Sequence, residues 1–463
     1  MTENSFDLVV IGGGPAGYVG AIRAAQLGRR VALIEKEKPG GTCLHWGCIP
    51  TKSLLRSAEL FQQIKRADTF GIKVGSVEVD FPRVIQRSRA ISERLTKGIE
   101  SLFKKHGITH LTGTGTVISR GQVLFKTVTG ESQTLTSSHI LIATGAKPRL
   151  LPALPIDGQR VLASREAMVL SETPKSMAII GAGAIGVEFA FFFNAFGVQV
   201  TLVEMLPQIL PHEDEEIAAE LAKQFTRAGI RVLTGTRLEQ ARISGSGVTL
   251  GFSGKTTENI EAEKVLVAIG LEANLADALK PGLEVEREGG WLKTDERYQT
   301  SVSGLFAAGD VIGPPWLAHV ASFEAVQAVE GMFTARSPRK VSIFPSCIYC
   351  QPQVASVGLN EKKARELKKD YKVGKFPFFS LGKALAAGDN AGFVKILFGE
   401  PGGEILGAHI IGAEATELIS EMNLGMNVQA TRDHIIATLH AHPTLSEALA
   451  EAAASSVGEA IHL

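Results

Sequence analysis

One unit of sequence occurs twice in this chain and restricts the folds available to it. In the first copy, the apolar run 7–11 leads into the glycine-rich turn 12–17, then a helical pattern, a second apolar run and Glu35. In the second copy the turn spans 181–186, and Glu204 again stands 23 residues after the first glycine. A short apolar run before such a turn is typical of a buried strand. The repeat therefore predicts two doubly wound α/β domains.

Both turns have the spacing G-x-G-x-x-G, which alone is a weak signal. Here each turn follows a strand, opens a helix and ends on an acid, an order that is typical of dinucleotide binding. The glycines let the backbone approach a pyrophosphate, the helix N-terminus supplies N–H donors, and the acid accepts from ribose hydroxyls. Two tight turns without a ligand are the alternative. The predicted binding residues are Gly12, Gly14, Gly17 and Glu35 in the first copy and Gly181, Gly183, Gly186 and Glu204 in the second.

Glu204 indicates which nucleotide the second copy binds. A carboxylate there repels a 2′-phosphate, and residues 205–211 contain no arginine or lysine to receive one. The sequence therefore favours NAD over NADP. The glycines do not decide which copy holds a flavin. Because a close cysteine pair follows the first copy, we expect FAD in that copy.

Two further apolar runs, 140–145 and 265–270, resemble each other and end on glycine. We expect them to close the two units, with Thr144, Gly145 and Gly270 as cofactor-binding residues. From about residue 341 the pattern changes to mixed strands followed by helices, which predicts an α+β domain. The predicted domains are an FAD-binding domain over 1–147, an NAD-binding domain over 148–269, a central domain completing the FAD site over 270–340, and a dimerisation domain over 341–463.

The composition excludes several classes of protein. The formal net charge is zero, and no basic cluster indicates a nucleic-acid surface. The most apolar window, 177–206, contains Glu188, Asn194 and Gln199, which argues against membrane insertion. No basic segment precedes the first apolar run, so a secretory signal is not expected. We therefore expect a cytoplasmic protein.

Two of the four cysteines, Cys43 and Cys48, lie in the stretch GGTCLHWGCIPTK at 40–52. Thr42 is expected to cap a helix that runs from about Cys43 through Phe61. Residues five apart on a regular helix are separated by roughly 7.5 Å of rise, whereas a relaxed disulfide needs Cα atoms within about 7 Å. A bond between these two cysteines thus requires a distorted first turn, which Gly47 would allow. Such a strained bond is exchangeable rather than structural.

Two alternatives for the cysteine pair remain open. The pair could be two unbonded thiols, or half of a zinc site completed by Cys347 and Cys350. A spacing of five lies outside the usual zinc pattern, so no metal site is predicted. Cys347 and Cys350 stand on a strand-like run and are interpreted as buried thiols.

A histidine near the C-terminal end is a candidate acid–base group. The stretch HAHPTLSE at 440–447 precedes a predicted helix that ends at about Ser456. Thr444 and Glu447 have the spacing of a capping box. An imidazole oriented by a carboxylate is suited to proton transfer near neutral pH, which makes His442 with Glu447 a candidate pair. A polar loop histidine is the alternative.

These motifs together resemble those of the pyridine nucleotide-disulfide oxidoreductases over essentially the whole chain. The stretch 40–52 is similar to the family's redox-disulfide motif, and TSVSGLFAAGD at 300–310 to its second flavin motif. PPWLAHVASFEA at 314–325 and HAHPTLSEALAEAA at 440–453 resemble the branch that oxidises dihydrolipoamide. The resemblance implies oxidation of protein-bound dihydrolipoamide with FAD and NAD. It also implies a homodimer that serves the lipoyl domains and acyltransferase core of a 2-oxoacid dehydrogenase or glycine cleavage complex.

The resemblance also implies roles for single residues. Cys43 would exchange with the substrate dithiol, and Cys48 would face the flavin. Lys52 would approach the flavin and pair with Glu188 near the nicotinamide. Asp310 would bind the ribityl chain. Further cofactor contacts are implied for Gly309 and Ala318.

His442 would act as the base, oriented by Glu447, and would come from the other subunit. Some positions depart from the family pattern. His45 stands where asparagine is usual, and Leu271 and Ala273 stand where arginine and proline are common. None of these changes removes a catalytic group. A disulfide reductase acting on another substrate and a non-catalytic flavoprotein are the competing hypotheses, and Glu204 argues against a glutathione reductase that reads NADPH.

Overall fold

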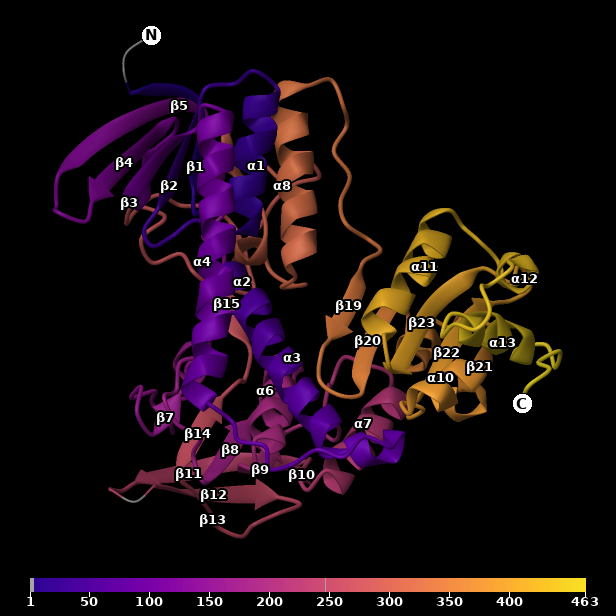
Figure 1. The fold of residues 1–463 in the computed structure, drawn as a ribbon. Coiled ribbons are helices and arrows are strands. Elements are labelled where there is room, and N and C mark those ends of the chain that lie inside the picture. The colour runs from indigo at the N-terminus through magenta and orange to yellow at the C-terminus, as the bar shows by residue number, and fades with distance from the viewer. Residues whose placement is uncertain (1–3, 246) are drawn as a thin grey trace. The chain divides into compact units, whose positions relative to one another are not determined.

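A computed structural model describes residues 4–245 and 247–463, and Figure 1 shows their course. By their contacts, these residues form two compact units. Unit 1 lies within 1–53, 82–149 and 270–342, and unit 2 lies within 54–81, 150–269 and 343–463. Unit 1 contains the first glycine turn and the close cysteine pair. Unit 2 contains the second glycine turn and the C-terminal region.

Unit 1 is built on a largely parallel sheet. Its strands are β1 (Ser5–Ile11), β2 (Val31–Glu35), β3 (Thr109–Ser119), β4 (Gln122–Thr127), β5 (Ser132–Ile142) and β18 (Leu305–Ala307). The central strand β1 pairs in parallel with β2 and β5, β2 with β3, and β5 with β18. β4 pairs antiparallel with β3 and β5. The run Leu8–Ile11 is buried throughout because helices and further chain cover both faces, as expected for parallel strands.

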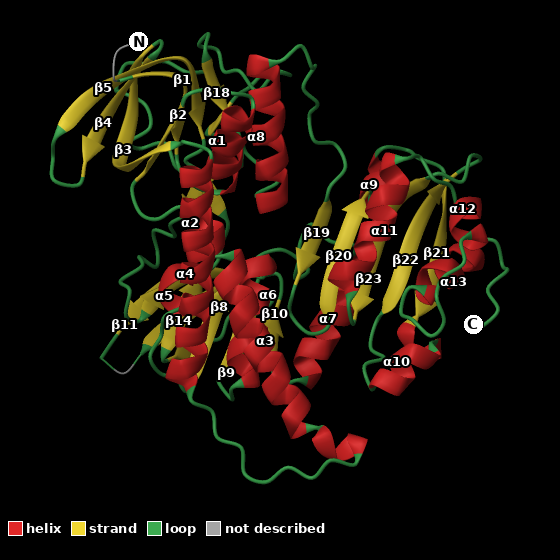
Figure 2. Ribbon diagram, turned by 45° about the horizontal axis from the view of Figure 1, so that its top comes forward, coloured by secondary structure: helices red, strands yellow, loops and turns green. Residues whose placement is uncertain are grey.

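Small residues bring the first glycine helix close to the sheet of unit 1. Helix α1 (Pro15–Gln26) lies beside α8 (Ala318–Phe333), as both ribbon views show (Figures 1 and 2). A Cβ at Gly20 would stand 3.0 Å from the Leu141 side chain and 3.4 Å from that of Ala325. The glycine therefore lets α1 pack on β5 and α8 at the same time. Unit 1 also holds α2 (Gly41–His45), the first turn of α3 (Cys48–Lys65), nearly all of α4 (Phe81–Lys105) and the short helix η2 (Asp310–Ile312).

Unit 2 repeats the nucleotide-binding architecture. Its parallel sheet has the order β10 (Arg231–Leu233), β9 (Gln199–Val203), β8 (Ser176–Ile180), β14 (Lys264–Val267) and β7 (Val161–Leu162). Helix α6 (Ala184–Ala195) follows the second glycine turn, and nine of its twelve residues are buried. The apolar window 177–206 is thus two buried strands and a buried helix. Among the described residues, no helix is both long and apolar enough to cross a membrane.

The C-terminal part of unit 2 is an antiparallel sheet with helices. The strand order is β19 (Pro345–Ile348), β20 (Gln353–Gly358), β23 (Ile405–Gly412), β22 (Phe393–Gly399) and β21 (Tyr371–Pro377). Helices α11 (Ala415–Asn427) and α13 (Glu447–Ser455) pack against these strands and enclose an apolar core. This arrangement agrees with the predicted α+β region.

The remaining elements are short or lie at the edges. They are η1 (Ala67–Phe70), β6 (Ala146–Pro148), α5 (Ser164–Ala167), α7 (Glu215–Arg227), β11 (Thr236–Ile243), β12 (Val248–Gly254), β13 (Ile260–Ala262), β15 (Leu271–Ala273), β16 (Arg287–Glu288), β17 (Trp291–Leu292), α9 (Glu361–Glu366), η3 (Phe378–Ser380), α10 (Gly382–Ala387) and α12 (Arg432–Ala437). The predicted fold class, two doubly wound nucleotide-binding units with a C-terminal α+β region, is confirmed. The predicted domain boundaries stay a prediction.

Candidate active site

The first glycine turn forms a cradle that admits no side chain. Gly12 has φ +103°, and a Cβ there would overlap the carbonyl oxygen of Ala143. A Cβ at Gly17 would overlap the carbonyl oxygen of Gly12. Helix α1 begins directly after Gly14 with Pro15 in its first turn, where a missing N–H costs nothing. The remaining N–H groups of that turn are available to a pyrophosphate.

The acid of each copy is fixed to its own glycine turn. Glu35 Oε2 accepts from the backbone N–H of Gly13 at 2.6 Å, and its Oε1 accepts from that of Glu37 at 2.8 Å. Such a carboxylate keeps lone pairs for ribose hydroxyls while its position is held by the backbone. Sequence reasoning assigned the acid to the ribose alone and missed its bond to the turn.

The second copy reproduces this arrangement. Glu204 Oε2 accepts from Ala182 N–H at 2.8 Å, and Oε1 accepts from Leu206 N–H at 2.9 Å. Gly181 has φ +102°, and a Cβ there would overlap the carbonyl oxygen of Ala268. The repeat in sequence is therefore a repeat in side-chain geometry as well.

Asp310 lies where β18 ends, close to the first turns of α1 and α8. Its neighbour Gly309 has φ +77°, and a Cβ there would stand 3.0 Å from Ala16 and 3.1 Å from Ala321. Burial raises the pKa of Asp310 to about 6, only partly offset by its own backbone N–H. A buried acid of this kind is stabilised by hydroxyl donors, which a ribityl chain supplies. The Thr144 hydroxyl oxygen is also buried without a hydrogen-bond partner among the described residues. The residues of unit 1 therefore fit FAD.

One functional residue at this point was missed from the sequence. Glu324 on α8 accepts from the Gly309 N–H at 2.9 Å and so holds the segment that presents Asp310. Burial raises the pKa of Glu324. Glu324 stands fourteen residues after Asp310, and this spacing does not predict a contact. The contact depends on how α8 packs against the segment that follows β18.

The cysteine pair lies at a break between two helices. The predicted single helix from Cys43 through Phe61 is wrong, because α2 ends at His45 and α3 begins at Cys48. Thr42 is likewise inside α2 and does not cap it, since the cap position is Gly40. A Cβ at Gly47 would stand 3.0 Å from the carbonyl oxygen of Thr42, so the break needs a glycine there.

The break brings the two cysteine side chains together. The side chains of Cys43 and Cys48 share a hydrogen bond, which is the largest reason that the pKa of Cys43 is raised, followed by burial. The charge of Lys52 acts in the opposite direction, and that of Asp310 adds to the rise. Both thiols, the lysine and the flavin-site acid thus belong to one neighbourhood of unit 1. Whether the pair forms a reversible disulfide stays a prediction.

Glu188 is buried in α6, in unit 2. It is 5% exposed, and its Oε1 accepts from the backbone N–H of Tyr349 at 2.9 Å. Lys52 belongs to unit 1, and its predicted pairing with Glu188 stays a prediction.

His442 and Glu447 are paired as predicted. His442 Nδ1 donates to Glu447 Oε1 at 2.8 Å, which leaves Nε2 as the proton acceptor of a neutral ring. Glu447 Oε2 accepts from the Thr444 N–H at 2.8 Å. Burial alone would raise the pKa of Glu447, but these two hydrogen bonds outweigh it and lower the pKa. The imidazole side chain is 80% exposed, so it lies on the surface of unit 2 and is accessible to solvent.

The predicted capping box at this helix is only half correct. Glu447 bonds the Thr444 backbone as a box requires, but the cap position of α13 is Ser446. The Thr444 hydroxyl instead donates to the carbonyl of Ala441 at 2.6 Å. Sequence reasoning also missed His440, whose Nε2 lies 3.0 Å from Glu421 and whose pKa this hydrogen bond raises.

The other two cysteines contact backbone carbonyl groups within unit 2. Cys347 Sγ donates to Thr416 O at 4.0 Å, and Cys350 Sγ donates to Pro352 O at 3.4 Å. Cys350 is buried as predicted, but Cys347 is only partly buried. Within 4–245 and 247–463, no group of three or more His, Cys, Asp or Glu side chains is arranged to hold a metal ion.

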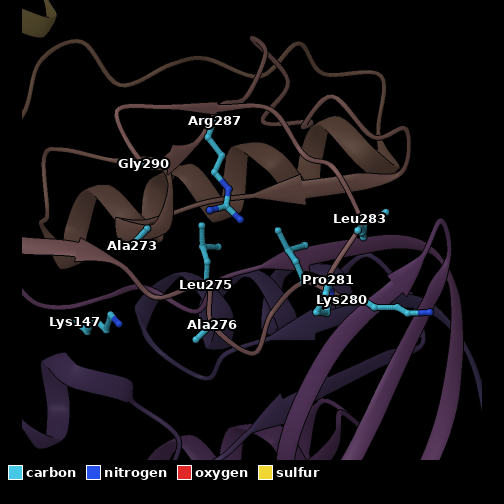
Figure 3. A pocket seen from close by; sticks show the side chains of 11 residues that line it. Lys147, Ala273, Leu275, Ala276, Lys280, Pro281, Leu283, Arg287 and Gly290 are labelled. Carbon is cyan, nitrogen blue, oxygen red and sulfur yellow. The ribbon is translucent and has the colours of Figure 1, made fainter.

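A separate hollow of about 420 Å³ lies in unit 1 around residues 273–290 (Figure 3). Leu275 and Leu279 line it, and so do three cationic residues, Lys147, Lys280 and Arg287. Figure 3 shows that Arg287 points towards Leu275 whereas Lys280 extends away from the hollow. Because the cations do not converge and no predicted catalytic residue lines it, this hollow is not the active site.

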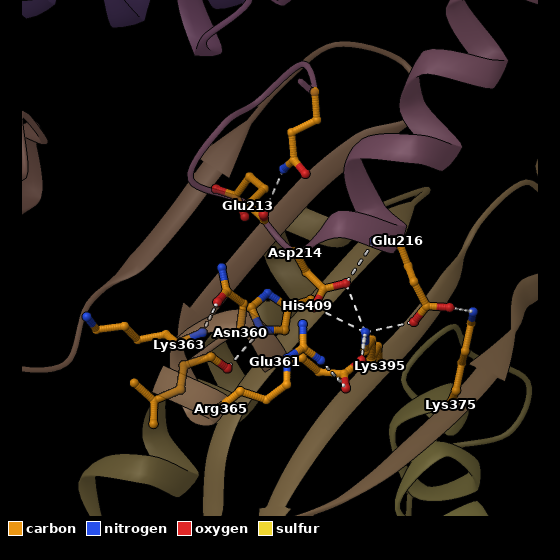
Figure 4. Close-up of polar contacts among 12 residues, drawn as sticks. Glu213, Asp214, Glu216, Asn360, Glu361, Lys363, Arg365, Lys375, Lys395 and His409 are labelled. Carbon is orange, nitrogen blue, oxygen red and sulfur yellow. Dashed lines mark hydrogen bonds and ion pairs between the residues drawn. The ribbon is translucent and has the colours of Figure 1, made fainter. Parts of the chain in front are cut away.

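Unit 2 contains a partly buried cluster of charges outside the predicted sites (Figure 4). Lys395 on β22 is 1% exposed, and its Nζ contacts Asp214 at 2.9 Å, Glu361 at 2.6 Å and Glu216 at 2.7 Å. Burial would lower the pKa of Lys395, but the three carboxylates outweigh it and raise the pKa. Asp214 also caps α7 by accepting from the Glu216 N–H. The cluster thus joins α7 to the C-terminal sheet within unit 2.

The class of protein follows from two glycine cradles, each with an anchored acid, and from a cysteine pair beside the first. The pyridine nucleotide-disulphide oxidoreductase model matches residues 6–325, and the dimerisation-domain model of the same family matches residues 344–453. The chain therefore belongs to the pyridine nucleotide-disulphide oxidoreductase family. The family uses FAD and NAD(H).

Sequence relatives and solved structures show which members of this family the chain resembles. The chain is 42% identical to a dihydrolipoyl dehydrogenase of Zymomonas mobilis and to one of Bacillus subtilis, each alignment covering 99% of both chains. Among solved structures, LpdA from Mycobacterium tuberculosis superposes with a TM-score of 0.89 at 26% identity, covering 96% of this chain and 98% of that one. The flavoprotein disulfide reductase RclA from Escherichia coli gives 0.87 at 25% identity, covering 97% and 99%.

Proposed function

We propose that this protein is a dihydrolipoyl dehydrogenase, which oxidises protein-bound dihydrolipoamide and reduces NAD to NADH. The observation that supports this most is the hydrogen-bonded pair Cys43 and Cys48 in one neighbourhood with Lys52 and Asp310. A non-catalytic flavoprotein would not need two adjacent thiols at this place. The similarity to dihydrolipoyl dehydrogenases over nearly the whole chain supports the same substrate class.

The two thiols have different tasks in the proposed reaction. A substrate thiolate attacks the Cys43 sulfur of a Cys43–Cys48 disulfide, forming a mixed disulfide and releasing the Cys48 thiolate. The second substrate sulfur then displaces Cys43 and closes the lipoamide ring. One disulfide replaces another, so two electrons and two protons move from substrate to protein. Bound FAD supplies the ring system through which the electron pair reaches NAD as hydride.

The proposed base is His442, which takes a proton from a substrate thiol at Nε2. Glu447 accepts from Nδ1, which fixes the tautomer and stabilises the imidazolium. We propose that His442 acts on the Cys43–Cys48 pair of the other subunit of a homodimer. The match of residues 344–453 to a dimerisation domain supports the homodimer. The proposed partners are the lipoyl domains of an acyltransferase core in the cytoplasm.

The proposal is tested with purified protein reconstituted with FAD. Dihydrolipoamide and NAD should yield NADH, and a dihydrolipoyl domain should serve as a better substrate than the free amide. NADPH with glutathione disulfide should give no turnover. Flavin binding without dihydrolipoamide turnover would reject the substrate assignment and favour a reductase of another disulfide.

Replacing His442 with glutamine should lower kcat/KM for dihydrolipoamide by about 10²-fold or more, because general-base catalysis contributes at least this much. The fold should be unaffected, since the side chain is 80% exposed. Reduction of an artificial quinone by NADH needs no dithiol and should keep its rate. His462→Gln is the matched control, because His462 is also exposed and pairs with a carboxylate, Glu451, at 2.7 Å. Equal rates for His442→Gln and wild type would remove His442 as the base.

Glu204→Gln should raise KM for NAD about tenfold with little change in kcat, because a hydrogen bond to a charged acceptor contributes about 1.5–3 kcal/mol. The amide keeps the volume of the buried side chain but cannot accept at both positions. Steady-state kinetics with varied NAD measure the effect. Glu215→Gln, in the exposed first turn of α7, is the control. An unchanged KM would mean that Glu204 holds only the glycine turn.

A further inference from the structure

His45 and Trp46, two of the four residues between the cysteines, are held by side chains of α4 and by the loop after Glu35. His45 Nε2 lies 3.0 Å from Pro39 O and 3.2 Å from Thr96 Oγ1. A carbonyl oxygen only accepts, so Nε2 carries the hydrogen. The Thr96 hydroxyl donates to Ser92 O at 3.0 Å, which makes its oxygen the acceptor of the same His45 N–H. One ring nitrogen therefore connects α2 to two other segments.

Arg89 holds the backbone at the same residue. Its Nη1 donates to the carbonyl oxygen of His45 at 2.7 Å. This carbonyl belongs to the last residue of α2, where helix carbonyls have no partner inside the helix. The guanidinium also lies 5.0 Å from the ring centre of Trp46, and Trp46 Nε1 donates to Glu37 at 3.2 Å. Side-chain contacts thus hold the last residue of α2 and the first residue of the break between α2 and α3.

The ties from α4 come from one face of that helix. Arg89, Ser92 and Thr96 stand at intervals of three and four, which places their side chains in one row. Thr96 is 1% exposed and Ser92 3% exposed, and Arg89 and Thr96 of this row contact His45. A rigid 25-residue helix therefore fixes the position of residues 45 and 46.

We propose that His45 is a positioning residue of the redox pair, acting through the backbone between Cys43 and Cys48. The inference rests on the proposed function, because it assumes that the pair cycles between dithiol and disulfide. By holding the break, His45 limits the freedom of the two sulfurs in the dithiol state. Closing the disulfide then costs less conformational entropy, so the disulfide is favoured. Without the tie, the dithiol gains freedom and the disulfide becomes easier to reduce.

The test is a redox titration of the FAD-loaded protein in glutathione buffers. Each conversion of the dithiol to the disulfide reduces one glutathione disulfide to two glutathiones, so two electrons and two protons are balanced. Thiol alkylation followed by mass spectrometry reports the fraction oxidised at Cys43 and Cys48. His45→Leu should shift the equilibrium about tenfold towards the dithiol, which is about 30 mV for this two-electron couple.

A conservative variant separates positioning from packing. His45→Gln can place an amide N–H near the position of Nε2, so it should restore most of the wild-type equilibrium. His106→Leu, a histidine just beyond the end of α4 with no side-chain tie to residues 43–48, should leave the equilibrium unchanged. If His45→Leu does not fold, Arg89→Met removes the tie to the His45 carbonyl and should shift the equilibrium in the same direction.

The outcomes distinguish this inference from the proposed function. A wild-type pair that never forms a disulfide in oxidised glutathione would reject both. A wild-type disulfide whose potential is unchanged in His45→Leu and Arg89→Met would reject the positioning role alone. Turnover of dihydrolipoamide is measured separately, so its absence would reject the substrate without deciding the role of His45.

Discussion

Cys43→Ser is expected to reduce dihydrolipoamide oxidation on the order of 10⁴-fold or more, because losing the group that carries the covalent step has effects of this size. Serine is nearly isosteric with cysteine, so the fold and FAD binding should persist. A hydroxyl oxygen cannot form a disulfide with Cys48 and cannot exchange with a substrate dithiol. NADH formation from dihydrolipoamide, at matched flavin content, measures the loss.

The variants Cys43→Ser and Cys48→Ser should lose activity at different steps of the reaction. In Cys48→Ser, Cys43 keeps its thiol but has no partner to close on. Given oxidised lipoamide, the Cys43 thiolate should open the ring disulfide and form a mixed disulfide that mass spectrometry detects, with the second lipoamide sulfur leaving as a thiol. The long-wavelength absorption expected from a thiolate beside the flavin should also disappear. Cys347→Ser is the control, since that thiol contacts Thr416 O in unit 2. A mixed disulfide on Cys48 in Cys43→Ser, rather than on Cys43, would reverse the assigned roles.

The glycine turns could be predicted because their determinants are local. A strand, a turn and a helix follow one another within residues 5–26 and again within 176–195. A Cβ at Gly17 or Gly186 would overlap the carbonyl oxygen of the first glycine of the same turn. The same local order appears twice, so each copy supports the interpretation of the other. The anchoring of Glu35 and Glu204 by the turn is also local, and the fixed spacing of 23 residues is its signature.

The break at the cysteine pair could not be predicted in the same way. Stereochemistry indicated that the first turn had to be distorted, but it did not show that the helix ends at His45. The partners that hold the break, Arg89 and Thr96, lie 44 and 51 residues further along the chain. Such ties depend on how α4 packs. The spacing of Arg89, Ser92 and Thr96 places them on one face of the helix, but it does not indicate which segment that face contacts.

The buried lysine illustrates a second limit of sequence reasoning. Lys395 interrupts the apolar strand FVKILFG. Because apolar residues stand on both faces of this strand, the alternation of side chains does not show whether Lys395 faces the core or solvent. Asp214, Glu216 and Glu361 precede it by 181, 179 and 34 residues. Only the tertiary fold of unit 2 brings one cation and three carboxylates together.

Lys395→Met is expected to lower the free energy of unfolding of unit 2 by about 3–5 kcal/mol, because removing one partner of a buried ion pair leaves uncompensated charge. Asp214 is 2% exposed, so its carboxylate is buried from bulk solvent. Urea unfolding, followed by fluorescence and by the loss of FAD separately, measures the shift of each transition. Lys293→Met is the control, because its pair with Glu286 is half exposed and solvent screening leaves such a pair little effect on stability. Equal shifts in the two variants would show that the cluster adds no stability.

The destabilisation by Lys395→Met should also depend on pH in one direction. In the native cluster, burial would raise the pKa of Asp214 and of Glu361, but the hydrogen bonds to Lys395 outweigh it and lower both pKa values. The stability they contribute is present above the pKa of an unfolded carboxyl, about 4, and is lost as the pH falls through the lowered values. The pKa of Lys395 is raised, so its contribution is present below about pH 10.4 and is lost as the pH rises beyond that.

In the Lys395→Met variant, burial without the cation raises the pKa of Asp214, and the carboxyl can become neutral by taking up a proton. The difference in stability between wild type and Lys395→Met should therefore be largest near pH 7 and should shrink towards about pH 4, and a difference that grows on acidification would contradict the assignment of the cluster.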